Sequence, residues 1–245
     1  VHGSIDRRGC LVGAARFAVG AAGAAGLLAA LGPKFAAAQQ VSADDKRLSP
    51  KHVEFASPKG YGKASGYLAR PAKAKGPLPL VLVAHENRGL NPHIEDIARR
   101  LALEGFLALA PDLLSVAGGT PADDDQARDL HTKTDKSAML SAALAAIPFL
   151  KSHPESTGKV GAVGFCYGGG VVNSMATASP DLSAGVAYYG AQPPAAQVPA
   201  IHAALLLQYG GLDERINAGI PAYEAALKAA GKRYTIYIYP NVNHA

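Results

Sequence analysis

From residue 50 onward the chain alternates short apolar runs with segments of helical spacing. The apolar runs fit strands buried on both faces of a sheet, and they lie at residues 79–84, 106–110, 160–165, 184–189, 203–209 and 234–239. Helical patterns fall between them, at residues 92–103, 123–133, 135–151, 167–177 and 217–230. Two more strands, 52–56 and 63–69, flank Gly60 and Tyr61 and predict a hairpin. This alternation predicts an α/β fold with one mostly parallel central sheet flanked by helices.

The first 40 residues follow a different pattern. The pair Arg7 and Arg8 precedes an uncharged stretch, residues 17–33, and the small residues 36–38 follow. This is the order of an export signal, and twin arginines favour the Tat route, which exports folded proteins. We expect residues 1–38 to be a Tat-type signal peptide and the protein to be periplasmic or extracellular. An uncleaved anchor helix is disfavoured, because a bilayer span needs about 20 apolar residues.

We expect residues 39–50 to be a linker and residues 51–245 to form one α/β domain. The sequence begins at Val1 and stops at Ala245, directly after a histidine. We therefore expect the sequence to be part of a longer protein, with a truncated C-terminus.

Composition excludes several classes of protein. The chain has 245 residues, of which 49% are hydrophobic and 18% charged, which rules out a disordered chain or a coiled coil. Its net charge of +5 is dispersed, so nucleic acid is not an expected partner. Two cysteines without a C-x-x-C pair offer no zinc site. The acidic run 123–125 is interpreted as a helix start, where carboxylates favour the dipole, and not as a metal site.

The segment Gly164-Phe165-Cys166-Tyr167-Gly168-Gly169 carries the most chemical information. It joins a strand to a helix with the form G-x-C-x-G-G, which is the nucleophile-elbow pattern with sulfur in place of oxygen. Glycines two residues before and after Cys166 would let the helix pack closely. The helix N-terminus would stabilise a thiolate and a developing oxyanion, with the backbone N–H of Tyr167 as one donor. The alternative is a tight turn with a buried cysteine.

Two further residues favour a catalytic role. Asp213 follows the strand 203–209, and His244 lies in the loop after the strand 234–239. The order Cys166, Asp213, His244 is the nucleophile–acid–histidine order of α/β-hydrolases. Each would lie at the sheet edge where open α/β sheets carry their sites. Taken singly, Asp213 could be a turn residue and His244 a surface residue.

These segments, with His85-Glu86-Asn87-Arg88 and the run 237–240 before His244, resemble the dienelactone hydrolase family over about residues 50–245. The resemblance implies the α/β-hydrolase fold and a Cys-His-Asp triad that cleaves small esters or lactones through a thioester, without metal or cofactor. Glu86 matches the family glutamate that helps to activate the thiol. The backbone N–H of Asn87 would be the second oxyanion donor.

Some alternatives stay open at this point. Arg88 could bind the carboxylate of a substrate or only neutralise Glu86. The enzyme could be a general carboxylesterase or thioesterase that uses the same triad. A different class is a non-catalytic protein of this fold that binds a small ligand or senses oxidants through Cys166. The sensor is disfavoured because residues 39–245 contain no second cysteine to resolve an oxidised thiol. No stable membrane anchor is expected.

Overall fold

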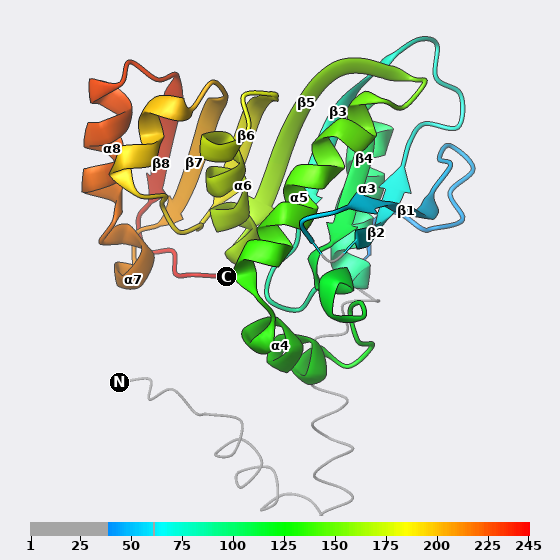
Figure 1. Cartoon of the computed structure of the whole chain (residues 1–245), viewed down its shortest axis with the longest axis horizontal. Helices are drawn as coiled ribbons and strands as arrows, with labels where there is room; N and C mark the ends of the chain where they lie inside the picture. The colour runs from blue at the N-terminus through cyan, green and yellow to red at the C-terminus, as the bar shows by residue number, and fades with distance from the viewer. Residues whose placement is uncertain (1–38, 61) are drawn as a thin grey trace, which may run out of the picture. The chain divides into compact units, whose positions relative to one another are not determined.

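The computed structural model describes residues 39–60 and 62–245. The predicted signal peptide, residues 1–38, lies outside the described residues. Eight strands form one sheet in the order β1-β2-β4-β3-β5-β6-β7-β8 (Figure 1). Their bounds are β1 Lys51–Ser57, β2 Gly62–Ala69, β3 Leu78–Ala84, β4 Leu107–Asp112, β5 Ser156–Phe165, β6 Leu182–Tyr188, β7 Ala204–Gly210 and β8 Tyr234–Tyr239.

The sheet is mostly parallel, as the apolar runs predict. β1 and β2 form the expected antiparallel hairpin, and β2 also pairs antiparallel with β4. Every other pairing in the sheet is parallel. The carboxyl ends of β3, β5, β6 and β7 therefore meet at one edge, where a site can be assembled from the loops that follow them.

Helices cover both faces of the sheet. They are α3 Pro92–Leu103, α4 Asp124–Lys133, α5 Lys136–Lys151, α6 Tyr167–Ala178, α7 Glu214–Asn217 and α8 Ile220–Ala229, with 3₁₀ turns η1 Leu113–Ala117 and η2 Ala195–Ala200. Figure 1 shows α5, α6 and α8 on the near face, where a large apolar core includes residues of all three helices. A second core, which contains Ile94, Ala98 and Ala102 of α3, lies on the other face.

Two boundaries differ from the sequence prediction. The helix predicted over residues 217–230 begins later, at the start of α8, and Asn217 instead ends α7. The two helices are separate because Pro221 has no N–H and its ring would clash with the carbonyl of Asn217 in a continuous helix. The strand predicted to stop before Pro111 continues through Asp112. Pro111 is accommodated near the carboxyl end of β4, and the Asp112 side chain then accepts from Leu114 N at 3.0 Å to cap η1.

Predicted caps are confirmed at two helices. The Asn91 side chain accepts from Ile94 N at 3.1 Å and starts α3, with Pro92 at its first position. Asp123 starts α4 and accepts from the backbone N–H groups of Asp125 and Gln126. Asp123 thus satisfies two free N–H groups of the helix terminus, and the acidic run lies at a helix start, as the sequence predicts.

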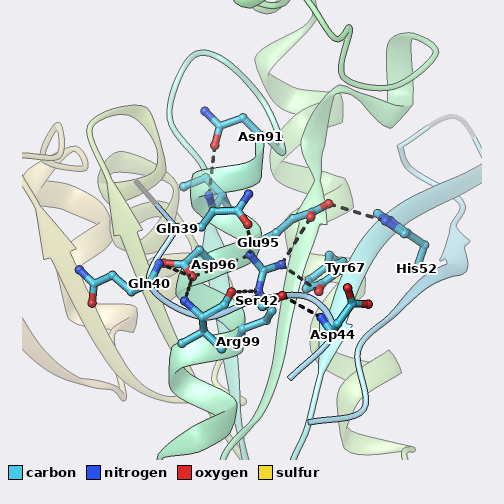
Figure 2. A network of polar contacts seen from close by, with 12 residues as sticks. Gln39, Gln40, Ser42, Asp44, His52, Tyr67, Asn91, Glu95, Asp96 and Arg99 are labelled. Carbon is cyan, nitrogen blue, oxygen red and sulfur yellow. Dashed lines mark hydrogen bonds and ion pairs between the residues drawn. The ribbon is translucent and has the colours of Figure 1, made fainter. Parts of the chain in front are cut away.

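A buried arginine fixes the start of the described chain to α3 (Figure 2). Arg99 is 1% exposed; its Nε donates to Val41 O at 2.8 Å and its Nη1 to Tyr67 Oη at 2.9 Å. Asp96 Oδ1 accepts from Val41 N at 2.8 Å and from Gln40 N at 3.2 Å.

Within the described residues, no helix has the length and apolar character that a bilayer crossing requires.

Candidate active site

Cys166 lies at the turn between β5 and α6. Its backbone has φ 54° and ψ −115°, a left-handed conformation that costs a non-glycine residue of order 1–3 kcal/mol. The turn is held by two backbone hydrogen bonds, from Cys166 N to Tyr188 O at 3.1 Å and from Gly170 N to Cys166 O at 3.3 Å. A strained residue held by its surroundings is typical of a nucleophile elbow.

The glycines of the elbow have the close neighbours that the sequence predicts. A Cβ on Gly164 would overlap the Gly168 carbonyl and lie 2.9 Å from Gly169 N. A Cβ on Gly168 would overlap the Ala84 carbonyl and lie 2.7 Å from His85 O. The first turn of α6 therefore packs backbone to backbone against β5 and the end of β3, which places the N-terminus of α6 beside the loop that carries Glu86.

His244 and Asp213 meet Cys166 at the same sheet edge. His244 Nε2 lies 3.1 Å from Cys166 Sγ, and His244 Nδ1 lies 2.5 Å from Asp213 Oδ2. The segment after β8 brings His244 back towards the end of β5, as Figure 1 shows. An ionised carboxylate only accepts hydrogen bonds, so Nδ1 carries the imidazole proton and the Nε2 lone pair faces the thiol.

The surroundings of this group favour a neutral thiol and an ionised carboxylate. Burial raises the pKa of the Cys166 thiol, the backbone N–H of Tyr167 opposes that rise, and the charge of Glu86 adds to it. Burial also acts to raise the pKa of Asp213, but the hydrogen bonds from His244 and from Ile216 N hold that pKa below its usual value. A neutral thiol is a weak nucleophile, and the His244 Nε2 lone pair lies within reach of its proton.

The loop after β3 is held by a second histidine. His85 is fully buried, its Nε2 accepts from Leu113 N at 3.0 Å, and its Nδ1 donates to Glu86 O at 2.6 Å. Burial lowers the pKa of His85, which keeps the ring in this neutral form. His85 thus ties the loop that contains Glu86 and Asn87 to the start of η1. The sequence analysis named His85 only as part of a segment that resembles the family and gave it no role of its own.

Tyr189 is another residue that the sequence analysis missed. Its backbone has φ 39°, and its ring lies 4.9 Å from the His244 ring. Burial, and then the charges of Glu86 and Cys166, raise the pKa of the Tyr189 phenol. The Tyr189 side chain therefore packs against His244, among the groups that the sequence selected.

A pocket of about 700 Å³ opens beside Cys166 and His244. Asn87, Tyr167 and Tyr189 line it, together with two cations, Lys136 and Arg215. Among the described residues, no Asp or Glu lines the pocket, which leaves Glu86 outside the lining. Arg88 also lies outside the lining. The described residues also contain no group of three His, Cys, Asp or Glu side chains that could hold a metal ion. The contacts among Cys166, His244 and Asp213 beside this pocket are suited to acyl transfer on a small molecule.

Comparison with known proteins shows the family to which this sequence is related. The model of the dienelactone hydrolase family matches residues 64–245. The chain belongs to the dienelactone hydrolase family. It is therefore a hydrolase that acts on ester or lactone bonds, and its fold is the α/β-hydrolase fold.

Relatives of this family differ in how much of the chain they match. "Putative carboxymethylenebutenolidase" of Escherichia coli O157:H7 is 35% identical over 194 residues, which are 73% of this chain and 71% of that protein. "Putative hydrolase fragment YghX" of Escherichia coli K12 is 50% identical over 105 residues, which are 43% of this chain and 90% of that protein. Among solved structures, "Putative Dienelactone Hydrolase" from Klebsiella pneumoniae is 30% identical, with a TM-score of 0.69 over 80% of this chain and 88% of that one.

Proposed function

We propose that this member of the dienelactone hydrolase family cleaves its substrates with a Cys166–His244–Asp213 triad and a thioester intermediate. The observation that carries the proposal is the chain of contacts from Cys166 Sγ to His244 Nε2, 3.1 Å, and from His244 Nδ1 to Asp213 Oδ2, 2.5 Å. A nucleophile, a base and a residue that orients the base are thereby within hydrogen-bond reach of one another.

In the first half of the reaction, His244 Nε2 takes the thiol proton as Cys166 Sγ attacks the carbonyl carbon. The carbonyl electron pair moves to oxygen, and the backbone N–H groups of Tyr167 and Asn87 stabilise that oxyanion. When the tetrahedral intermediate collapses, the carbon–oxygen bond to the leaving group breaks and His244 returns the proton to the departing alkoxide or enolate. A thioester on Cys166 remains.

In the second half, water attacks the thioester with His244 as base. Collapse of the second tetrahedral intermediate releases the carboxylic acid and restores the thiol. Asp213 keeps the imidazole oriented and stabilises its cation in both halves. The charge of Glu86 raises the pKa of the thiol and so favours its protonated form at rest, and its expected role in activating the thiol stays a prediction.

The lining of the pocket favours anionic substrates. Lys136 and Arg215 are the charged lining residues, and Arg88, the residue that the sequence singled out for a substrate carboxylate, lies outside this lining. We therefore assign the attraction of an anionic ester or lactone to Lys136 and Arg215. A general carboxylesterase or thioesterase would use the same triad and would show no preference for an anionic acyl group.

A substrate panel tests the proposal. Wild type and Cys166→Ala are assayed on p-nitrophenyl acetate and on a dienelactone. Turnover of both that disappears in the variant supports the cysteine hydrolase, and the ratio of the two rates separates a lactonase from an esterase. A folded wild type that turns over neither, while Cys166 reacts with a thiol reagent, would support a binding or redox role instead.

Export is part of the proposal and rests on the sequence of residues 1–38 alone. If that segment is a Tat signal, it should carry a folded reporter protein across the inner membrane of a bacterium. Replacement of Arg7 and Arg8 by Lys should leave the reporter in the cytoplasm. Export of the variant at the wild-type level would contradict the assignment.

A further inference from the structure

One residue that lines the active-site pocket has a buried polar atom that the proposed mechanism does not use. His131, near the end of α4, lines the pocket and is 8% exposed. Its Nε2 is buried and has no hydrogen-bond partner among the described residues. Burial of a polar atom without a partner is unfavourable, because the atom loses its hydrogen bonds to water. A ligand in the pocket would offset that cost if it supplied the missing hydrogen bond.

The imidazole is held in place by its neighbours. Its ring meets the Tyr167 ring edge-on, with centroids 4.4 Å apart and an interplanar angle of 80°. The Lys136 ammonium donates to His131 O and, at 3.1 Å, to Thr134 O, and it lies 5.8 Å from the Tyr167 ring centroid. Tyr167 is also the residue that follows Cys166. The histidine is therefore fixed relative to the nucleophile, as a residue that reads a substrate must be.

The same neighbours determine the charge of the ring. Burial, the charge of Lys136 and the nearby His85 lower the pKa of His131 to about 4. The imidazole is then neutral at pH 7 and recognises a group by hydrogen bonding, not by charge. A hydroxyl group both donates and accepts, so it satisfies Nε2 in either tautomer of the neutral ring. A hydroxyl also avoids placing another charge beside a buried neutral group.

We propose that His131 is a specificity-determining residue, whose Nε2 hydrogen-bonds a hydroxyl group on the acyl part of the substrate while Cys166 attacks the carbonyl. The inference rests on the proposed function, because it assumes that the acyl group occupies this pocket. It assigns substrates of the hydroxyacyl ester or hydroxylated lactone class. Sites built to hydrogen-bond a substrate hydroxyl discriminate strongly against analogues that lack it.

The test compares pairs of esters that differ by one hydroxyl group. These are the p-nitrophenyl esters of butyrate and 3-hydroxybutyrate, and of hexanoate and 6-hydroxyhexanoate. The readout is the ratio of kcat/KM within each pair. His131→Phe keeps an aromatic ring but removes Nε2, and His131→Gln restores a polar group near that position. His202→Phe is the matched control, because His202 is an exposed histidine outside the pocket lining.

In at least one pair, wild type should favour the hydroxylated ester, and His131→Phe should lower the ratio about 10-fold, the value of one buried hydrogen bond. His131→Gln should recover most of the ratio, and His202→Phe should keep it. Equal ratios in wild type and His131→Phe in both pairs would overturn the assignment. So would a His131→Gln variant that loses the ratio as fully as His131→Phe, since shape and not hydrogen bonding would then be responsible.

A measurement on the wild-type protein covers the case in which these variants do not fold. With ¹⁵N-labelled histidine, millimolar 3-hydroxybutyrate or 6-hydroxyhexanoate should shift the His131 Nε2 resonance, and butyrate and hexanoate should not. The same response to all four acids would contradict the inference. The two proposals fail differently. If wild type shows no hydroxyl preference but its turnover still depends on Cys166, only the role of His131 is contradicted. If turnover persists in Cys166→Ala, the triad is contradicted.

Discussion

Gly164→Ala places a methyl group where the elbow has no space for one. The added Cβ would overlap the Gly168 carbonyl and lie 2.9 Å from Gly169 N. These are backbone atoms in the first turn of α6, so no flexible side chain can move aside. Carbon atoms in ordinary contact are about 3.5–4.0 Å from their neighbours, so α6 must move by about 1 Å to relieve the overlap.

That displacement has two measurable consequences. Overpacking of this kind costs about 1–3 kcal/mol, and for a domain of about 200 residues each kcal/mol lowers Tm by roughly 2–4 °C. We therefore expect Gly164→Ala to lower Tm by roughly 2–12 °C. A shift of the nucleophile by about 1 Å should also lower kcat/KM about 100-fold, because the 3.1 Å contact between Cys166 Sγ and His244 Nε2 depends on it.

Gly161→Ala provides the control on the same strand. There the nearest atom to an added Cβ is Ala184 O at 3.7 Å, an ordinary contact. Calorimetry and ester hydrolysis on both variants make the comparison. Gly161→Ala should stay close to wild type in both measurements. If Gly164→Ala also kept the wild-type Tm and activity, the close packing described for the elbow would be incorrect.

Three further predictions follow from the charges around the site. Glu86→Gln removes a charge that raises the pKa of Cys166, so the pH midpoint for alkylation of Cys166 by iodoacetamide should move to lower pH. Arg215→Gln removes a charge that lowers that pKa, so the midpoint should move to higher pH. A shift in the same direction for both would contradict the electrostatic account. Asp213→Asn should lower kcat by about 10⁴-fold, as in other triads that lose the carboxylate, and loss of less than tenfold would exclude Asp213 as the orienting acid. Lys136→Gln should raise KM for p-nitrophenyl hemisuccinate about 10-fold more than for p-nitrophenyl butyrate, the value of one charged hydrogen bond; an equal rise would remove Lys136 from anion binding.

Local patterns were sufficient to predict much of the fold. The apolar runs identified the parallel strands because a strand buried on both faces must be apolar throughout. The elbow was predictable because a backbone that is strained at Cys166 and packed closely at Gly164 and Gly168 requires those residue types in that order. The break before α8 was missed because Pro221 is also acceptable in the first turn of a helix, and the sequence pattern does not fix where that turn begins.

The pocket lining was less predictable, because it depends on contacts between distant segments. His131 and Lys136 come from the junction of α4 and α5, and Tyr189 comes from the loop after β6. None of them belongs to a motif, and each acquires its position only when α4, α6 and the end of β6 pack together. Arg88 shows the converse, since its position beside Glu86 in sequence does not place it in the pocket lining.

The central claim is that Cys166 carries the acyl group during turnover. The most direct test is to mix the protein with p-nitrophenyl acetate, quench in acid within milliseconds, and locate the added mass by peptide mass spectrometry. We predict an acetyl group on the peptide that contains Cys166, and none on the corresponding peptide of Cys166→Ala. If His244→Ala reacts, its acetyl group should be longer-lived than that of wild type. Steady turnover without any acyl group on Cys166, or undiminished turnover in Cys166→Ala, would contradict the account.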